Sequence, residues 1–304
     1  MKKIKEIGEF GIIGRISRRT KTDRSVMLGI GDDAAVIKTD GDKCLLFASD
    51  MIVEGVHFDL KKAKPFDIGW KALCVNISDI AAMGGVPRYA CVSAGINKNT
   101  KLRSTDGIYS GILSAARRFG VNIVGGDTSS SDKLVIDVSI IGEARKGEII
   151  YRSGAKPGDV ILVTGTLGGS IKGKHLKFTP RIRESQFLVK NFKINSMIDI
   201  SDGLSSDLSH ICKSSGVGAK IYESLIPLSK DARSVKSALS DGEDYELLFT
   251  VPKKGLSRMI KRFKKRSKTP LAVIGEVTKK NAGIKIVDRF GRILSLTGRG
   301  FAHF

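Results

Sequence analysis

Aspartates in several short motifs are the residues of this chain that can do chemistry. The motifs are GIGDDAAVI with Asp32 and Asp33, FASDMIVEGVHF with Asp50, VNISDIAAMGG with Asp79, VGGDTSS with Asp127, and IDISDGLSSDL with Asp199 and Asp202. Each acid lies at or near the end of an apolar run or beside glycine. Carboxylates in such places cost free energy unless a positive group pairs with them, and hard cations such as Mg²⁺, which also binds phosphates, are common partners. The pattern predicts a metal-dependent enzyme that acts on phosphates.

The first acids are expected on a hairpin. Residues 34–37 and 44–48 are apolar runs separated by the turn signal Asp40-Gly41. Ser49 and Asp50 follow the second run, and a hydroxyl beside a carboxylate is a suitable pair for a hard ion. Glycine and aspartate are also common turn residues, so GIGDDAAVI has a plain structural alternative.

A helix is expected to carry Asp79. Pro65 begins it, apolar residues recur at helical spacing up to residue 83, and Gly84-Gly85 ends it. Asn76 and Asp79 share one face because they are three residues apart. A charge in so apolar a helix must be paired or bind metal, unless this face reaches solvent.

The other motifs have both functional and structural interpretations. VGGD predicts a strand entering a glycine loop, whose N–H groups hold phosphate and whose Asp127 holds the metal, although no Walker A sequence follows. In IDISDGLSSDL, Ser201 or Asp202 can simply cap the next helix. His57 can contact a phosphate or a substrate ring, but a lone histidine is more often a surface or core residue. SDGEDYELLF alternates like a half-buried strand with acids at its entrance, where a cationic ligand can bind.

The elements as a whole predict an α+β fold with two domains. Further strands are expected at 88–96, 121–124, 134–141, 159–163, 197–200, 246–251 and 271–274, and further helices at 103–119, 204–214 and 256–265. The pattern breaks into charge and glycine near residues 146–156, so we expect domains at 1–148 and 149–304.

Composition narrows the class of protein. The 304 residues carry 52 Lys+Arg against 31 Asp+Glu, a formal net charge of +21, which suits either nucleic-acid binding or a merely solvated surface. The acids concentrate in glycine-containing motifs, so we favour an acidic reaction centre on a basic body. The four cysteines include no C-x-x-C pair, which disfavours zinc and disulfides. We see neither a signal peptide nor a membrane span, and expect a cytoplasmic enzyme.

The ordered set of motifs resembles the thiamine-monophosphate kinase family, within the aminoimidazole-ribonucleotide synthetase-like ATP-binding superfamily. To the aspartate motifs it adds KALCVNISDIAAMGGVP, RSGAKPGDVILVTGTLG, GEDYELLF and the terminal GFAHF, across nearly the whole chain. GGDT recurs throughout the superfamily, whereas the combination of DMIVEGVHF, RSGAKPGD, GEDYEL and the aromatic-x-His-Phe end is much more specific to the kinase.

The resemblance implies a function and an assembly. It implies ATP-dependent phosphorylation of thiamine monophosphate to thiamine diphosphate on several Mg²⁺ ions. It implies an N-terminal ATP- and Mg²⁺-binding domain, a mixed sheet with helices that forms a barrel across a homodimer, and a sandwich-like α/β C-terminal domain that completes the nucleotide and substrate site. No specific nucleic acid and no membrane are implied.

The resemblance also assigns residues, motif by motif. The metal ligands would be Asp33, Ser49, Asp50, Asp79, Asp127, Asp199 and Asp202. ATP would be contacted by Tyr109, Gly126, Asp127, Arg152 and Ser201, and thiamine monophosphate by His57, Glu243 and Phe301. No residue is expected to act as a covalent nucleophile.

Some positions depart from the family pattern. Ala48 replaces a frequent hydroxyl, Gly169 replaces an acid, and Ser240-Asp241-Gly242 replaces a glycine pair. Two other classes stay open: a sister ATP-dependent synthetase, as in the purine pathway, and a basic nucleic-acid-binding protein. GEDYELLF and GFAHF disfavour the synthetase, and the scarcity of aromatics disfavours the nucleic-acid binder.

Overall fold

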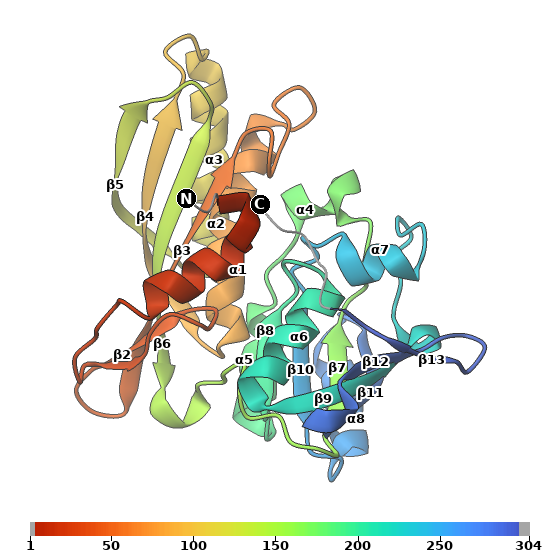
Figure 1. The fold of residues 1–304 in the computed structure, drawn as a ribbon. Coiled ribbons are helices and arrows are strands. Elements are labelled where there is room, and N and C mark those ends of the chain that lie inside the picture. Colours follow the sequence, from red (N-terminus) through yellow and green to blue (C-terminus); the bar gives the residue numbers. More distant parts are fainter. Residues whose placement is uncertain (1–3, 298–304) are drawn as a thin grey trace.

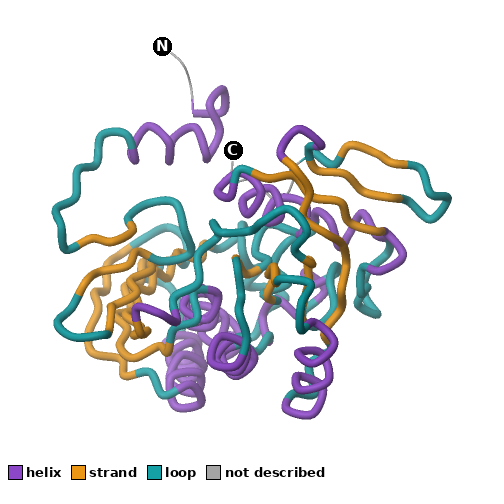
Figure 2. The backbone as a smooth tube through the Cα atoms, turned by 90° about the horizontal axis from the view of Figure 1, so that it is seen from below, coloured by secondary structure: helices purple, strands orange, loops and turns teal. Residues whose placement is uncertain are grey.

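The structure, a computed structural model, describes residues 4–297 and contains two β-sheets that lie side by side (Figure 1). The first sheet belongs to the first half of the chain and the second sheet to the other half. Helix α1 (Ile4–Ser17) precedes both, changes direction at Gly8, and stands away from the rest of the chain (Figure 2). The predicted α+β fold with mixed sheets and helices is confirmed.

The first sheet has six strands in the order β1-β2-β3-β6-β4-β5. They are β1 (Val26–Leu28), β2 (Ala35–Lys38), β3 (Lys43–Val53), β4 (Val86–Ile96), β5 (Asn122–Ser130) and β6 (Val135–Arg145). The predicted hairpin is β2 and β3, which pair antiparallel, whereas β4 and β5 pair parallel. Side chains of β3 alternate between the core and the opposite face, which exposes Phe47 and Met51.

Two long helices cover the core face of this sheet. They are α2 (Pro65–Ala82), with proline in its first turn, and α3 (Leu102–Phe119), which ends at Gly120 in the left-handed conformation. The two helices meet backbone to backbone. A Cβ atom on Gly69 would lie 1.8 Å from the carbonyl oxygen of Ile108, and one on Gly111 would lie 2.0 Å from that of Phe66.

The second sheet has seven strands in the order β13-β12-β9-β11-β7-β10-β8. They are β7 (Val160–Thr164), β8 (Ser196–Asp199), β9 (Val217–Tyr222), β10 (Leu247–Val251), β11 (Leu271–Lys279), β12 (Ile284–Val287) and β13 (Ile293–Ser295). All residues of β7, β8 and β10 are buried, because helices cover both faces of the sheet's centre.

The helices of the second half form two layers around this sheet. Helices α6 (Leu204–Ser215) and α7 (Val235–Ser240) pack on one face, and α5 (Ile182–Asn191) and α8 (Leu256–Arg266) pack on the other. The short helix α4 (Lys174–Lys177) lies against α2. The result is a layered arrangement of helices, sheet and helices.

Helix α2 also contacts the second half of the chain. Its Ala82 belongs to the core that α5 and α8 share, and the hydroxyl of Ser185 donates to the carbonyl of Ala81 at 2.6 Å. Helix α2 therefore packs against both halves, which places its polar residues between the two sheets.

Two local predictions were wrong. Gly125, Gly126 and Asp127 lie within β5 and not in a loop. The strand predicted at 246–251 is β10, but the alternating residues before it in SDGEDYELLF form no strand, because Glu243 and Tyr245 adopt positive φ of 55° and 50°. The sequence patterns also did not predict α1, α4, α5, α7, β1, β9, β12 and β13.

Candidate active site

Three carboxylates from distant parts of the sequence converge between the two sheets, two of them buried and that of Asp79 half-buried. Asp33 lies in the loop before β2, Asp79 on α2, and Asp199 at the end of β8. One oxygen of each lies within 4.8 Å of one oxygen of both others. All three are predicted metal ligands, and the structure brings their side chains together.

The carboxylates of this cluster destabilise one another's charged form. Burial raises the pKa of Asp199 to about 8, and the negative charge of Asp33 adds to the rise. Burial likewise raises the pKa of Asp79 well above its usual range, with further contributions from Asp50 and Asp199. A cation between the carboxylates would relieve both the repulsion and the desolvation.

The donor set fits a hard divalent cation. It consists of oxygen atoms only, and buried Asp33 Oδ2 has no hydrogen-bond partner among the described residues. The hydroxyl of Ser78 donates to Asp199 Oδ2 at 2.5 Å and so orients that carboxylate. Oxygen ligands in this number, left partly unsatisfied by the protein, suit Mg²⁺ completed by phosphate oxygens.

Arg152 supplies positive charge at the edge of the cluster. Its Nη2 lies 2.5 Å from Asp33 Oδ1, and its backbone N–H donates to Asp32 Oδ2 at 3.1 Å. The pKa of Asp32 is raised to about 7, first by burial and then by the charge of Asp33, while Arg152 opposes both effects. The predicted phosphate-binding arginine therefore lies beside the predicted metal ligands.

Ser49 and Asp50 lie on opposite faces of β3. The N–H of Asp50 donates to Asn76 Oδ1 on α2 at 3.0 Å, and its charge acts on Asp79 and Asp199. Ser49 instead contacts Asp137 and Ser139 of β6 on the open face of the sheet. Adjacent residues of a strand point to opposite faces of the sheet. Within a single copy of the chain, the Ser49 hydroxyl and the Asp50 carboxylate therefore do not bind the same ion.

Three other predicted residues lie apart from the buried cluster. Gly126 and Asp127 are on the exposed edge strand β5, and Tyr109 is half-buried on α3. The register places Asp127 opposite Ser93 of β4. A Cβ at Gly126 would lie 1.7 Å from the carbonyl oxygen of Val92, so the close approach of β4 already explains this glycine.

Asp202 belongs to a second group at the start of α6. One ligand atom each of Asp202, Asp207 and His210 lies within 4.8 Å of the others. Buried Asp207 accepts from the N–H groups of Asp202 and Gly203 at 3.2 and 3.1 Å. Gly203 is the N-cap residue and no side chain makes the cap hydrogen bond of α6, so the predicted cap by Ser201 or Asp202 is wrong.

The predicted substrate residues His57 and Glu243 are joined by a lysine that sequence reasoning missed. Lys71 of α2 is fully buried, donates to the carbonyl oxygen of His57 at 2.9 Å, and forms an ion pair with Glu243. The ring of His57 is held as well, because its Nδ1 accepts from the N–H of Val53 at 2.9 Å. A lysine within an otherwise apolar helix was the available signal. Phe301 lies outside the described residues.

Two of the departures from the family pattern have local explanations. Ala48 is buried on the core face of β3. Gly169 has φ of 71°, and a Cβ there would lie 2.4 Å from the carbonyl oxygen of Asp231. The position of Gly169 therefore favours glycine for steric reasons.

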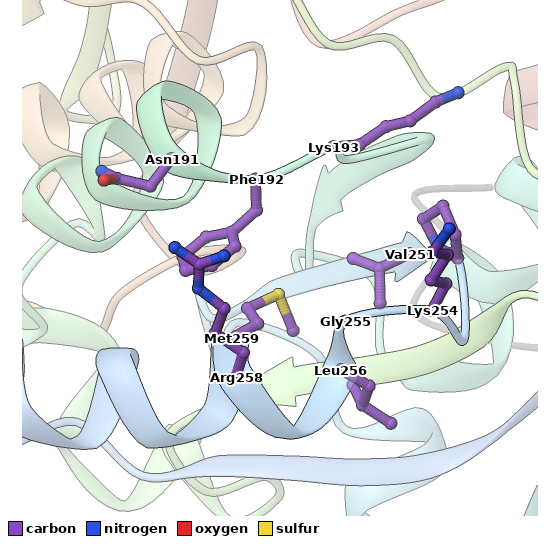
Figure 3. Close-up of a pocket in the computed structure, with 10 residues that line it drawn as sticks. Asn191, Phe192, Lys193, Val251, Lys254, Gly255, Leu256, Arg258 and Met259 are labelled. Atoms are coloured by element: carbon purple, nitrogen blue, oxygen red, sulfur yellow. The ribbon is translucent and has the colours of Figure 1, made fainter.

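A pocket of about 260 Å³ lies at the other end of the second sheet, beside the first turn of α8 (Figure 3). Its lining includes Phe192, Lys193, Lys254, Arg258 and Met259, and no acid is among the lining residues. It lies where β10 ends at Val251, whereas β10 begins opposite Asp199. The pocket is therefore separate from the carboxylate cluster.

Comparison with known proteins identifies relatives along the whole chain. The family models described as AIR synthase related protein, N-terminal domain and C-terminal domain, match residues 31–144 and 156–288. The thiamine-monophosphate kinase of Bacillus subtilis is 35% identical, over 97% of this chain and 99% of the relative. That of Escherichia coli is 34% identical, over 98% of each.

Solved structures agree with these relatives. A structure described as AaThiL complexed with AMPPCP and TMP is 31% identical, has a TM-score of 0.85, and matches 100% of this chain and 99% of that one. The thiamine monophosphate kinase from Aquifex aeolicus is 30% identical with a TM-score of 0.77, covering 97% and 100%. The hydrogenase maturation protein HypE, at 22% identity, shares the fold.

Proposed function

The chain belongs to the thiamine-monophosphate kinase family, and from this membership we propose that it phosphorylates thiamine monophosphate to thiamine diphosphate with ATP. The observation that carries the proposal is the convergence of Asp33, Asp79 and Asp199 beside Arg152. Such a site can bring the phosphates of ATP and of thiamine monophosphate together, because its carboxylates attract cations and its arginine pairs with phosphate.

We assign the metal ligands as the sequence suggests. Mg²⁺ bound here would neutralise the phosphates and align them for transfer. The ligands would be Asp33, Ser49, Asp50, Asp79, Asp127, Asp199 and Asp202. The first sheet holds Ser49 and Asp127 on its open face, so we expect them to complete a site only when another surface covers that face.

ATP would be held by residues around the same cluster. Arg152 has the central role, because its guanidinium can exchange Asp33 for a phosphate oxygen. Ser201 and Asp127 would contact the phosphates or their ions, and Tyr109 and Gly126 would contact the rest of the nucleotide.

Thiamine monophosphate would be bound at the ring end by His57, Glu243 and Phe301. A carboxylate at Glu243 suits the cationic thiazolium, and an aromatic side chain at Phe301 suits stacking on a flat ring. His57 suits the phosphate side or the edge of a ring.

The reaction would be a direct in-line transfer. A terminal oxygen of thiamine monophosphate attacks the γ-phosphorus of ATP, the bond from that phosphorus to the β,γ-bridging oxygen breaks, and ADP leaves with the electron pair. The attacking oxygen is already anionic, so no strong general base is needed. The residues of the cluster orient the two phosphates, and no covalent enzyme intermediate forms.

We further propose that the enzyme is a homodimer in which the first sheets form a barrel, with domains at 1–148 and 149–304. The open face of the first sheet supports the dimer: Phe47, Met51, Tyr89 and Val124 are 43–60% exposed there. The sheet also has two free edges, β1 and β5. A second copy would cover this face and pair these edges.

The cytoplasm is our proposed location. None of the helices within residues 4–297 is long and apolar enough to cross a membrane. The four cysteines are free thiols, and three of them are buried. Reduced cysteines are the normal state in the cytoplasm.

Product identification tests the proposed function. The protein would be incubated with ATP, Mg²⁺ and, in competition, thiamine monophosphate, thiamine and formylglycinamidine ribonucleotide. We expect thiamine diphosphate and ADP, in equal amounts, as the dominant products. A product of the ribonucleotide would favour a purine-pathway synthetase, and no turnover together with tight binding of nucleic acid would favour the basic binding protein.

A further inference from the structure

Lys71 is the residue of this chain whose burial most requires a functional reason. Its side chain has no exposure to solvent, whereas most lysines lie on the surface of a protein. Burial lowers the pKa of Lys71, and the charge of Glu243 opposes that shift. Burying an ammonium group costs free energy unless it is paired, and a well-packed apolar residue often serves stability as well or better.

Lys71 joins two segments that lie far apart in the sequence. Its Nζ donates to the carbonyl oxygen of His57, 14 residues away, and to the carboxylate of Glu243, 172 residues away. The first segment follows β3 of the first sheet, and the second leads into β10 of the second sheet. One ammonium group therefore connects both walls of the proposed thiamine pocket.

Glu243 needs such a partner. Its backbone has φ of 55°, a conformation that costs a non-glycine residue free energy, and its N–H is tied to the carbonyl oxygen of Ser201 at 2.6 Å. The backbone of Glu243 is thus fixed. Its carboxylate is two methylene groups away from the Cα atom and can still point in several directions. The ion pair with Lys71 selects one direction for that carboxylate.

Helix α2 relates this pair to the metal cluster. Asp79 follows Lys71 by eight residues on the same helix, which corresponds to about 12 Å along the axis. The helix is rigidly packed, with nearly all of its residues buried. It therefore holds the carboxylate cluster, where phosphate would bind, and the Lys71–Glu243 pair, where the rings would bind, at a constant separation.

We propose that Lys71 is a positioning residue for substrate specificity: it aims the Glu243 carboxylate at the ring end of thiamine monophosphate. The inference rests on the proposed function. Lys71 itself does not touch the substrate, because its ammonium group is enclosed. It acts through Glu243, while the carbonyl of His57 holds its ammonium group in place, and so it affects the thiamine end and not the nucleotide end.

A double-mutant cycle tests this inference. We would measure steady-state kinetics, with each substrate varied, for wild type, Lys71→Met, Glu243→Gln and the double variant. We expect Lys71→Met to raise the KM for thiamine monophosphate about 10-fold or more, with the KM for ATP and kcat changed less than about threefold. The double variant should be no worse than Glu243→Gln alone, since Lys71 has lost the group through which it acts.

Two controls separate positioning from simple stabilisation. Ser185→Ala removes another buried hydrogen bond to α2, at Ala81, and should lower the melting temperature without changing either KM. If Lys71→Met does not fold, Lys71→Gln keeps a donor and similar length, and the cycle would be repeated with it. Multiplicative effects of the two substitutions, or equal effects on both substrates, would overturn the inference while leaving the kinase activity in place. A wild type that does not phosphorylate thiamine monophosphate would overturn both.

Discussion

Arg152 Nη2 and Asp33 Oδ1 lie 2.5 Å apart, which pairs a proposed ATP ligand with a proposed metal ligand. The two residues lie 119 positions apart in the chain and come from the two sides of the proposed domain boundary. In this arrangement the guanidinium already neutralises part of the charge of Asp33, through Oδ1. We expect the pair to loosen when Mg²⁺ and ATP bind, because each partner then gains an ion of opposite charge.

The Arg152–Asp33 pair predicts a stability effect that depends on magnesium. Arg152→Met should destabilise the protein in EDTA by about 3 kcal/mol, because it leaves a buried carboxylate unpaired. Urea unfolding would measure the loss. Excess Mg²⁺ should reduce it, since a cation can replace the arginine. Lys43→Met, which breaks an exposed pair with Glu143, should cost less than about 1 kcal/mol with or without Mg²⁺. Equal losses for Arg152→Met in both conditions would argue against a metal at Asp33.

Asp79 is predicted to be essential for catalysis but not for folding. Asp79→Asn keeps the shape of the side chain and removes the charge that would bind Mg²⁺, so we expect activity to fall by about 100-fold or more. Turnover would be assayed across Mg²⁺ concentrations, and circular dichroism would check the fold. Asp106→Asn, an exposed acid on α3, is the matched control and should leave activity unchanged. Near-normal turnover of Asp79→Asn at saturating Mg²⁺ would remove Asp79 from the ligands.

Glu243 and Phe301 are predicted to distinguish the thiamine end from the nucleotide end. Glu243→Gln and Phe301→Ala should raise the KM for thiamine monophosphate by about 10- to 200-fold, because each removes one contact to a ring. The KM for ATP should change far less. Steady-state kinetics with each substrate varied would measure both. If both variants weakened the two substrates equally, or neither substrate, our placement of the thiamine pocket would be wrong.

Asp244 predicts a dependence of stability on pH that is separate from the metal cluster. Burial raises its pKa to about 6, although the N–H of Gly168 favours the charged form. Between about pH 4 and 6 the folded chain retains a proton that the unfolded chain releases, so the contribution of this group to stability falls as pH rises through that window. The difference is about 2–3 kcal/mol at most.

Urea unfolding from pH 4 to 7 in EDTA would test this effect. The stability of wild type relative to Asp244→Asn should decrease over that range, because the amide does not titrate. Asp106→Asn should follow the wild type at every pH. A difference between wild type and Asp244→Asn that stays constant with pH would contradict the shifted pKa.

The basic surface is predicted not to form a specific nucleic-acid site. Residues 253–268 contain nine Lys+Arg and no acid, and α8 presents most of them to solvent. We expect weak binding to duplex DNA at low salt that disappears near physiological salt, as for contacts with phosphates alone. Replacing Lys261, Lys264, Lys265 and Lys268 by Gln should weaken the low-salt binding and leave kinase activity intact. Nanomolar, sequence-dependent binding at physiological salt would favour a nucleic-acid-binding protein over a kinase.

The sequence predicted the elements and acids that carry local signals. Helix α2 has proline at its start, and α3 ends at a glycine in the left-handed conformation, so both bounds were within two residues. Asp33, Asp79 and Asp199 stood out because a carboxylate beside apolar residues needs a partner. The three carboxylates meet because of how the two sheets pack against each other. A local sequence pattern does not contain that information.

The residues that were missed owe their roles to distant partners. Lys71 pairs with Glu243 across 172 positions, so its local context suggested only a lysine in an apolar helix. Asp207 accepts from the N–H groups of Asp202 and Gly203. It was missed because Ser201 and Asp202 lie where a residue that caps the helix is expected. The glycines of VGGD suggested a loop. Gly126 lies instead in a strand, where the backbone of Val92 approaches too closely for any side chain. Short strands such as β12 and β13 lack turn signals strong enough to separate them from loops.

The backbone contact between α2 and α3 makes a pair of glycines matter to catalysis from a distance. Gly69 and Gly111 touch no substrate in our proposal, but a methyl group at either would push the two helices apart. Since α2 carries both Lys71 and Asp79, its displacement would misalign the ring pocket and the carboxylate cluster together. A random screen for inactive variants should therefore recover substitutions at these glycines that leave every proposed ligand unchanged. Because the methyl group would clash with backbone atoms of Ile108 or Phe66, smaller side chains on the facing helix should not rescue such variants.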